Sequence, residues 1–405
     1  MKRMTYLAIN LALSVSAAAI AMAGDVTTVD GVTHVSNGAA PSGGVHDLEL
    51  EELWRRGGED DDVIFGVIVQ ALADDDGNVY LLDSQLSEVH VFDADGEFVG
   101  TLSREGDGPG EVRQPFDMLW MPDGTLGLVQ SFPGKIIQVN LDGTPAGDYR
   151  IGAEGAIIAV VEADCGGDNL VLGGLEVEIT QGGQIRHMFV AGYDAEGAEV
   201  GRYVSYDVTW DFSDMVMRER EQYGVLFNHW DVTSDGRVIT AADPEAYELK
   251  FHAVDGTLER IVTREYETLE RDDEAAALIR SALEAQKQQF PFEIGIQYEE
   301  DFPDVVSLTV HPSGEVWVLT SRGARNDLEG VITVYDVFSP DGHFVRQERL
   351  VCPGDGLMDG VIFAASDRVL VIRGLGDSMM NMIGGGGDSD EEAAPIEVVC
   401  YGIVR

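Results

Sequence analysis

The hydrophobic positions of this chain fall into short runs separated by tight, glycine-containing turns. The turns come in pairs, and each pair brackets two apolar runs. The paired turns lie at 76–77 and 95–96, 123–124 and 142–143, 235–236 and 255–256, and, less regularly, 167–168 and 196–197, and 313–314 and 341–342. An internal repeat decides the architecture, because each unit exposes an apolar face that only a neighbouring unit can cover.

The first unit shows what a repeat contains. Apolar strands are expected at 67–72, 79–82, 88–92 and 98–102. In the turns between them, Gly supplies a positive φ and Asp accepts hydrogen bonds from nearby backbone N–H groups. The second strand is apolar at consecutive positions, which is typical of a strand covered on both faces.

The spacing of the units fits the four-stranded blade of a propeller, which repeats about every 40 to 45 residues. Five copies are visible. A sixth is degenerate, with its strands at 360–363, 369–372 and 396–404. The sequence therefore predicts an all-β fold: a six-bladed β-propeller of four-stranded antiparallel blades with one inserted helix.

Three irregular segments interrupt the repeat. An extended hairpin is expected around 181–184. A helix is expected within Thr268–Phe290, where apolar residues have helical spacing before Pro291. The segment 374–395 is rich in Gly, Met and acidic residues and reads as a flexible loop. Residues 48–54 could add a strand to the last blade and close the ring, which would cover an exposed sheet edge.

The first 23 residues have the pattern of a secretory signal peptide. Lys2 and Arg3 precede an apolar run at 6–20, and Ala21-Met22-Ala23 forms a cleavage site. An uncleaved membrane anchor is the alternative, and the lack of a Cys after the site does not support a lipoprotein. We expect a protein exported to the periplasm or beyond, with a partly flexible segment at 24–47 and the propeller at 48–405.

Charge narrows the class of partners. The chain has 73 acidic against 26 basic residues and a net charge of −47. Such a surface repels phosphate backbones, so nucleic acid is a poor partner. The acidity fits either an adaptation to salty surroundings or a surface that collects cations. After the signal peptide, no stretch is long and apolar enough to span a membrane, and a monomer is the default expectation.

Three cysteines are too few for a disulfide framework. Cys352 and Cys400 both belong to the last unit, so a bridge between them is possible in an exported protein. Burial of all three as small hydrophobic side chains is the equal alternative.

The sequence resembles the NHL-repeat and TolB-like propellers exported by bacteria. The resemblance is carried by the linker Arg104-Glu105-Gly106-Asp107-Gly108-Pro109-Gly110-Glu111 with Pro115, and by the phrases at 76–83 and 91–96. It implies a six-bladed ring. In this family, lyases and lactonases build metal sites from polar groups on several blades, and the lyases repeat His on those blades.

Candidate site residues come from the innermost strands. Counting seven residues back from the turn glycine reaches Gln70, Asp117, His229 and Ser307, which are polar positions in apolar strands. Asn228 and Asp231 flank His229. These six residues are expected to line the central channel. Asp117, His229 and Asp231 could together hold a divalent metal ion, calcium or zinc, although only one His occupies the register that the lyases repeat.

Two functions remain open at this stage. The first is a non-catalytic exported scaffold that binds a protein, peptide or glycan partner, with no required cofactor. The alternative is a metal-dependent, lyase-like or lactonase-like enzyme with its site in the channel. No nucleophile elbow and no phosphate-binding loop occurs in the sequence, and the acidic turns lack the spacing of a calcium-binding loop.

Overall fold

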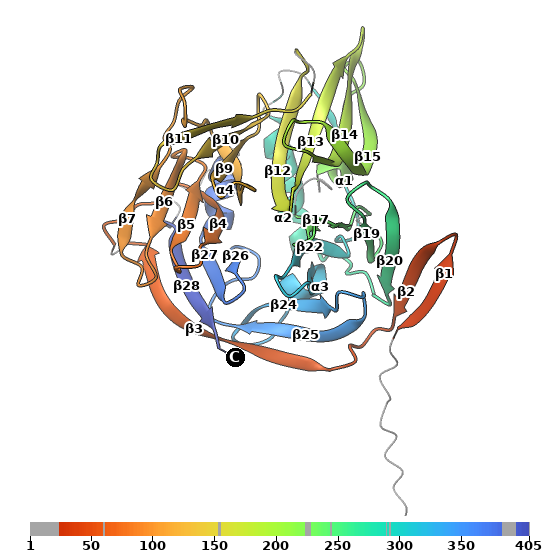
Figure 1. Cartoon of the computed structure of the whole chain (residues 1–405). Coiled ribbons are helices and arrows are strands. Elements are labelled where there is room, and N and C mark those ends of the chain that lie inside the picture. The colour runs from red at the N-terminus through yellow and green to blue at the C-terminus, as the bar shows by residue number, and fades with distance from the viewer. Residues whose placement is uncertain are drawn as a thin grey trace, which may run out of the picture.

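The computed structural model describes residues 24–59, 61–152, 155–222, 228–243, 245–288, 290, 293–382 and 394–404. The predicted signal peptide lies outside the described residues. Six blades stand side by side around a central axis and form a closed ring, in which the last two blades share one eight-stranded sheet (Figure 1). The fold is therefore the predicted six-bladed β-propeller of four-stranded antiparallel blades.

Each blade is a four-stranded unit whose first strand is nearest the axis. The first blade consists of β4 (Ile68–Ala73), β5 (Val79–Asp83), β6 (Glu88–Phe92) and β7 (Phe98–Leu102), and the second of β8 (Pro115–Trp120), β9 (Leu126–Gln130), β10 (Lys135–Val139) and β11 (Pro145–Tyr149). The third consists of β12 (Ile158–Gly166), β13 (Asn169–Ile179), β14 (Gly183–Tyr193) and β15 (Glu199–Asp211), and the fourth of β17 (Trp230–Val232), β18 (Val238–Thr240), β19 (Glu248–His252) and β20 (Leu258–Arg264). The fifth consists of β22 (Val305–Val310), β23 (Val316–Thr320), β24 (Val331–Phe338) and β25 (Phe344–Val351), and the last of β26 (Gly360–Ala365), β27 (Arg368–Arg373), β28 (Glu397–Ile403) and β3.

The ring is closed by β3 (Val45–Gly57), which runs along the bottom of Figure 1. Its second half pairs antiparallel with β28 and supplies the fourth strand of the last blade. Its first half pairs parallel with β25 of the fifth blade. The predicted closing strand at 48–54 is therefore present. It pairs with the fifth blade as well as with the last blade.

Residues 24–47, expected to be partly flexible, are instead strands and their connections. β1 (Asp25–Val29) and β2 (Val32–Asn37) form a hairpin, and β2 pairs parallel with β20 at the outer edge of the fourth blade. The Asn37 side chain explains the attachment. Its amide donates to the carbonyl oxygens of Thr263 and Gly342 at 3.1 and 3.0 Å, and its oxygen accepts from the N–H of Phe344 at 2.9 Å. The hairpin thus fastens the fourth blade to the fifth.

The irregular segments are inserts on the ring. The long strands β13, β14 and β15 extend the third blade as the expected hairpin. The predicted helix is α2 (Asp273–Lys287), capped by the Asp272 carboxylate. It packs with α1 (Glu219–Gln222) and the parallel strands β16 (Val216–Arg218) and β21 (Gly295–Gln297) around a small core of their own.

Two further helices occur where none was predicted. α3 (Ser321–Ala324) follows β23, and α4 (Leu375–Met382) follows β27. The start of the segment expected to be a flexible loop is therefore helical, and its remainder up to 393 lies outside the described residues. None of the described helices is long and apolar enough to cross a membrane.

Six hydrophobic clusters fill the spaces between neighbouring blades. Strand β5 shows why its sequence is apolar at every position. Val79 and Leu81 face the cluster shared with the last blade, whereas Tyr80 and Leu82 face the cluster shared with the second. Because both faces of each sheet are covered, the alternation typical of a half-exposed strand disappears.

The bridge between Cys352 and Cys400, one of the two alternatives, is not formed in this structure, where all three cysteines are free. Cys352 belongs to the cluster between the fifth and last blades, and Cys400 to the cluster between the last and first. The two thiols therefore lie on opposite sides of the sixth blade. Burial as small hydrophobic side chains, the alternative expectation, describes both.

Candidate functional site

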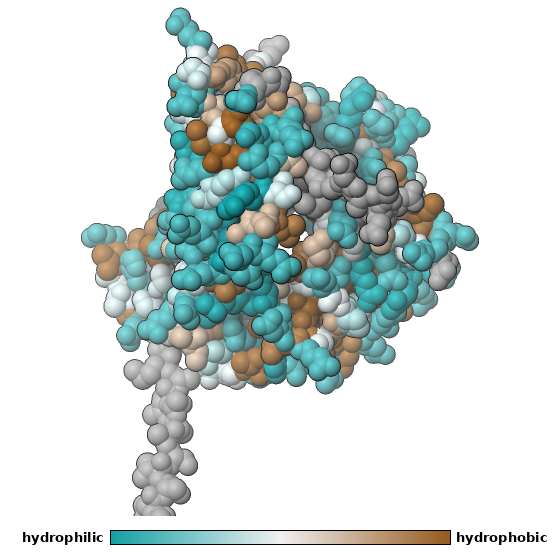
Figure 2. All heavy atoms as spheres, turned by 180° about the vertical axis from the view of Figure 1, so that it is seen from behind, coloured by the Kyte–Doolittle hydropathy of each residue, from teal (hydrophilic) through white to brown (hydrophobic). Residues whose placement is uncertain are grey.

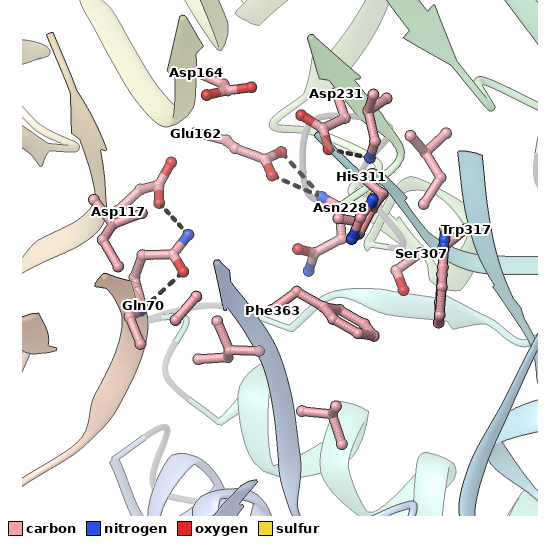
Figure 3. Close-up of a pocket in the computed structure, with 18 of the residues that line it drawn as sticks. Gln70, Asp117, Glu162, Asp164, Asn228, Asp231, Ser307, His311, Trp317 and Phe363 are labelled. Atoms are coloured by element: carbon pink, nitrogen blue, oxygen red, sulfur yellow. Dashed lines mark hydrogen bonds between the residues drawn. The ribbon is translucent and has the colours of Figure 1, made fainter. Parts of the chain in front are cut away.

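A cavity of about 620 Å³ follows the axis of the ring. The innermost strands of all six blades line it: β4, β8, β12, β17, β22 and β26. Figure 3 shows polar side chains from several blades converging on this space. By contrast, hydrophilic side chains spread widely over the rear face of the molecule (Figure 2). Every blade therefore contributes to the surface of this cavity.

Five of the six residues expected in the channel line this cavity: Gln70, Asp117, Asn228, Asp231 and Ser307. His229 does not. Its side chain is buried beside the fifth blade, where Nε2 lies 3.2 Å from the carbonyl oxygen of Val305. The backbone of Asn228 is left-handed, with a φ of 56°, so the regular alternation of an extended chain is broken there, and Asn228 and Asp231 both line the cavity while His229 turns away from it.

A recurrent bulge places several of these side chains. The pairing of β4, β8 and β22 with the next strand is interrupted immediately before Gln70, Asp117 and Ser307. The same interruption occurs in β12 immediately before Glu162. A bulge inserts an unpaired residue and redirects the side chains around it. The four residues are thus equivalent positions of four blades.

Two acidic residues of the third blade, Glu162 and Asp164, also line the cavity and were not among the predicted site residues. In this blade, β12 and β13 are joined by a shorter turn, in which Gly166 pairs directly with Asn169. Counting seven residues back from Gly167 therefore reaches the buried residue Val160. The available signal was the pair of acidic residues at alternate positions of an otherwise apolar strand.

Hydrogen bonds accepted by Asp117 and Glu162 join consecutive blades. Asp117 accepts from the amide of Gln70 at 2.9 Å on one side and from the N–H of Ala163 at 2.9 Å on the other. Glu162 accepts from the N–H of Asn228 at 3.0 and 3.2 Å. These contacts cross from the first blade to the second, from the second to the third, and from the third to the fourth.

The series continues with Asp231, whose carboxylate accepts from the N–H of Val310 on the fifth blade at 2.6 Å. Asp231 also interacts with the side chain of Asp164. Two neighbouring carboxyl groups cannot both ionise without repulsion. Ionisation of one member of the pair therefore opposes ionisation of the other.

Burial dominates the electrostatics of the cavity. It raises the pKa of Asp117 to about 6, against hydrogen bonds that favour the charged form. Burial, followed by the charge of Asp117, raises the pKa of Glu162 well above its usual range. The pKa values of Asp164 and Asp231 are also raised, first by burial. Among the described residues that line the cavity, there is no Lys or Arg to offset these charges.

The opposite wall, from the fifth and last blades, is largely aromatic. The Trp317 ring stacks on His311 with centroids 6.0 Å apart and meets Phe363 edge-on at 5.2 Å. Tyr335 packs against both Trp317 and Phe363. Trp317 is 6% exposed, and its buried indole N–H has no hydrogen-bond partner within the described part of the chain. The cavity thus has an acidic side and an aromatic side.

The predicted metal set is not assembled. Within the described residues, no three His, Cys, Asp or Glu side chains are grouped so that they could hold a metal ion. His229 points away from the cavity, and the oxygen atoms of Asp117 and Asp231 are engaged by backbone N–H groups. The expectation that Asp117, His229 and Asp231 share a metal ion is therefore wrong for this geometry.

Comparison with known proteins supports the fold. A family described as 6-bladed beta-propeller (DUF5128) matches residues 60–165, which span the first two blades and the inner strand of the third. Among curated proteins, none matches the chain. The match covers too little of the chain to establish membership, but it agrees with the repeat seen in the structure.

Solved structures resemble the ring at low sequence identity. A member of the DUF4221 family from Bacteroides vulgatus is 11% identical, with 89% of this chain and 99% of that chain covered and a TM-score of 0.51. A predicted exported protein from Bacteroides fragilis is 11% identical, with 92% of this chain and 100% of that chain covered and a TM-score of 0.46. A gluconolactonase from Xanthomonas campestris is 11% identical, with 90% and 92% covered and a TM-score of 0.43. At such identities, only the fold is shared.

Proposed function

We propose that the protein is an exported, non-catalytic binding protein that holds a small ligand in its central cavity. The observation that carries this proposal is the cavity itself, with a volume of about 620 Å³ and contributions from all six blades. Binding sites for small molecules have volumes of about 300 to 1,000 Å³ and combine apolar walls with a few polar groups. The acidic and aromatic sides of this cavity fit that description.

The size of the cavity limits the partner classes expected from the sequence. The end of a peptide or one unit of a glycan fits a space of this volume. A folded protein would contact only the rim of the ring. The ring also suits binding because its polar groups are fixed by contacts between blades, so little ordering is needed when a ligand enters.

Export is part of the proposal and rests on residues 1–23, whose charged start, apolar middle and Ala-x-Ala site form the pattern of a signal peptide. The metal-dependent lyase or lactonase alternative is not favoured by a specific observation. Its predicted ligand His229 faces away from the cavity, and the similarity to a gluconolactonase extends only to the fold.

The proposal can be tested by blocking the cavity. Ser307 lines it, whereas Thr27 of β1 is exposed on the outside of the ring. We expect a panel of monosaccharides, short peptides, amines and divalent cations to contain at least one compound that raises the melting temperature. The increase should disappear in Ser307→Trp and persist in Thr27→Trp. A compound that stabilises both variants equally would place binding outside the cavity and contradict the proposal.

A further inference from the structure

We infer that the ligand of the cavity carries a protonated primary amine, whose ammonium group is received by Glu162, Asp164 and Asp231, while the rest of the ligand lies against the aromatic wall. This inference rests on the proposed function, because it specifies the chemistry of the molecule that would enter the cavity. Figure 3 shows Asp117, Asp164 and Asp231 on different sides of Glu162. The acidic groups thus surround one side of the same space.

The charge of the cavity favours a cationic ligand. Four acidic side chains border the cavity, of which Asp117 is buried and Glu162, Asp164 and Asp231 are half-buried, and no Lys or Arg occurs among the described lining residues. Elsewhere on the protein, arginines are paired with acids, including the buried pair of Arg271 and Glu219 at 2.6 Å. Opposite charges attract strongly in a partly dehydrated site. A cation that entered the cavity would supply the positive charge that the chain itself does not place there.

The second argument comes from the other wall and is independent of the acids. Trp317 lines the cavity, is nine-tenths buried and has an indole N–H without a hydrogen-bond partner in the described chain. A buried polar group without a partner is costly, so an acceptor that a ligand brought against this donor would stabilise the bound state. Aromatic faces also attract cations and pack against apolar groups. A ligand with an ammonium group, an apolar body and an oxygen acceptor would satisfy both walls.

An organic ammonium fits better than a metal ion. Divalent cations require several oxygen atoms at short, fixed distances, and the described acids are not grouped for that purpose. An ammonium group donates three hydrogen bonds and tolerates looser geometry. It can bind the remaining lone pairs of carboxylates that already accept from the backbone, such as Glu162 and Asp231.

Two sources could supply this amine: a small free amine, or the terminal amino group of a peptide. Phenethylamine and the peptide Ala-Phe-Ala with an amidated C-terminus are suitable probes. Phenethyl alcohol and the N-acetylated form of the same peptide amide are their matched neutral controls, and glucose tests a neutral sugar. Calorimetry at pH 8 should detect binding of at least one amine and at least tenfold weaker binding of its neutral control. The amine that binds more tightly identifies the source.

The site variants are Glu162→Gln and Asp164→Asn, which remove charge with little change of shape. We expect each variant to weaken amine binding at least tenfold. Glu259→Gln, an exposed change on the outer strand β20, should leave it unchanged. Thermal melts of every variant verify folding. Binding should also release protons, measured in buffers of different ionisation enthalpy, because the ammonium group favours the ionised carboxyl groups.

The outcomes separate the two proposals. Equal binding of amines and neutral controls, or amine binding that both site variants retain, would overturn the inference. If glucose alone binds and Ser307→Trp abolishes that binding, the central binding function stands and the amine inference fails. If no probe binds in a way that Ser307→Trp affects, both proposals fail.

Discussion

The carboxylate of Asp117, on the inner strand of the second blade, accepts a hydrogen bond from the backbone N–H of Ala163 on the third blade at 2.9 Å. Asp231 on the fourth blade makes the equivalent contact with the backbone N–H of Val310 on the fifth blade, at 2.6 Å. Acidic side chains at the axis therefore have a structural role as well as their proposed role in binding. Experiments on them must measure stability alongside affinity.

The first prediction concerns the pH dependence of stability. The pKa values of Asp117, Glu162, Asp164 and Asp231 are raised in the folded state, so the folded protein binds more protons than the unfolded chain above pH 4. Stability contributed by these groups is present at low pH and is lost as pH rises through the raised pKa values. For Asp117, the loss falls between pH 4 and about pH 6.

Glu162→Gln tests this directly, because the amide oxygen can still accept from Asn228 while the charge is gone. We expect the variant to melt at the same temperature as the wild type at pH 4, and a few degrees higher at pH 8. Scanning calorimetry across this range measures the difference. Glu259→Gln, outside the cavity, should follow the wild-type profile. A variant that is less stable than the wild type at pH 8 would show that the ionised Glu162 stabilises the fold.

The second prediction compares two turn glycines with similar backbone conformations. Gly96 and Gly124 have φ values of 78° and 82°. A Cβ at Gly96 would lie 2.5 Å from Cγ of Trp54, whereas nothing lies within 4 Å of one at Gly124. Gly124→Ala should cost about 1 kcal/mol for the left-handed backbone alone. Gly96→Ala should cost about 1 to 3 kcal/mol more, because the Trp54 ring must move. Urea unfolding measures both, and equal costs would contradict the packing argument.

The third prediction concerns the N-terminal hairpin. Asn37→Ala removes three hydrogen bonds that join β2 to the fourth and fifth blades. We expect a loss of about 2 kcal/mol, because buried backbone groups are left without partners. Ser36→Ala, at the exposed neighbouring position, is the control and should change stability by less than about 0.5 kcal/mol. If the two variants unfold at the same urea concentration, the hairpin does not support the ring.

The fourth prediction concerns the insert that contains α2. Glu219 accepts from Arg271 at 2.6 Å, and both side chains are almost fully buried. Arg271→Met leaves a buried carboxylate without its cation, which typically costs about 3 to 5 kcal/mol. We expect proteases to cleave within 265–302, after the last strand of the fourth blade, much faster, while the segments on either side of the cut survive as large fragments on a denaturing gel. Arg280→Met, at an exposed position of α2, should be cleaved like the wild type.

The fifth prediction counts thiols. The protein unfolded without reductant should react with a thiol reagent at Cys165, Cys352 and Cys400, because all three are free. In the folded protein the reaction should be slow at pH 8, because burial raises the pKa of each thiol to about 11. Mass spectrometry of the labelled, unreduced protein gives the count. Only one labelled cysteine would indicate the bridge that the structure excludes.

The repeat made the fold predictable from the sequence. Turn glycines recur at a fixed place in each unit, and strands such as 79–82 are apolar at every position, so sheets stacked face to face were the consistent solution. The closing strand at 48–54 followed from the need to cover an open edge. The attachment of β2 to the fourth blade did not, because Asn37 meets Thr263 and Phe344 only after the ring has formed.

The site was predictable only in part. Gln70, Asp117 and Ser307 were found because their blades share one turn length. Glu162 and Asp164 were missed because the third blade has a shorter turn, and counting assigned His229 to the channel although its side chain turns toward Val305. A shift of one residue along a strand moves a side chain to the opposite face. Local irregularities therefore change a predicted site more than they change a predicted fold.

The sequence by itself determined the ring, the number of blades and the acidic character of the chain, because these follow from periodicity and composition. Only the tertiary structure decided which acids meet at the axis, that Asp164 and Asp231 interact, and that Trp317 forms part of the facing wall. These residues come from different blades, so their distances depend on how sheets far apart in sequence stack around the axis. Periodicity within one blade carries no information about that arrangement.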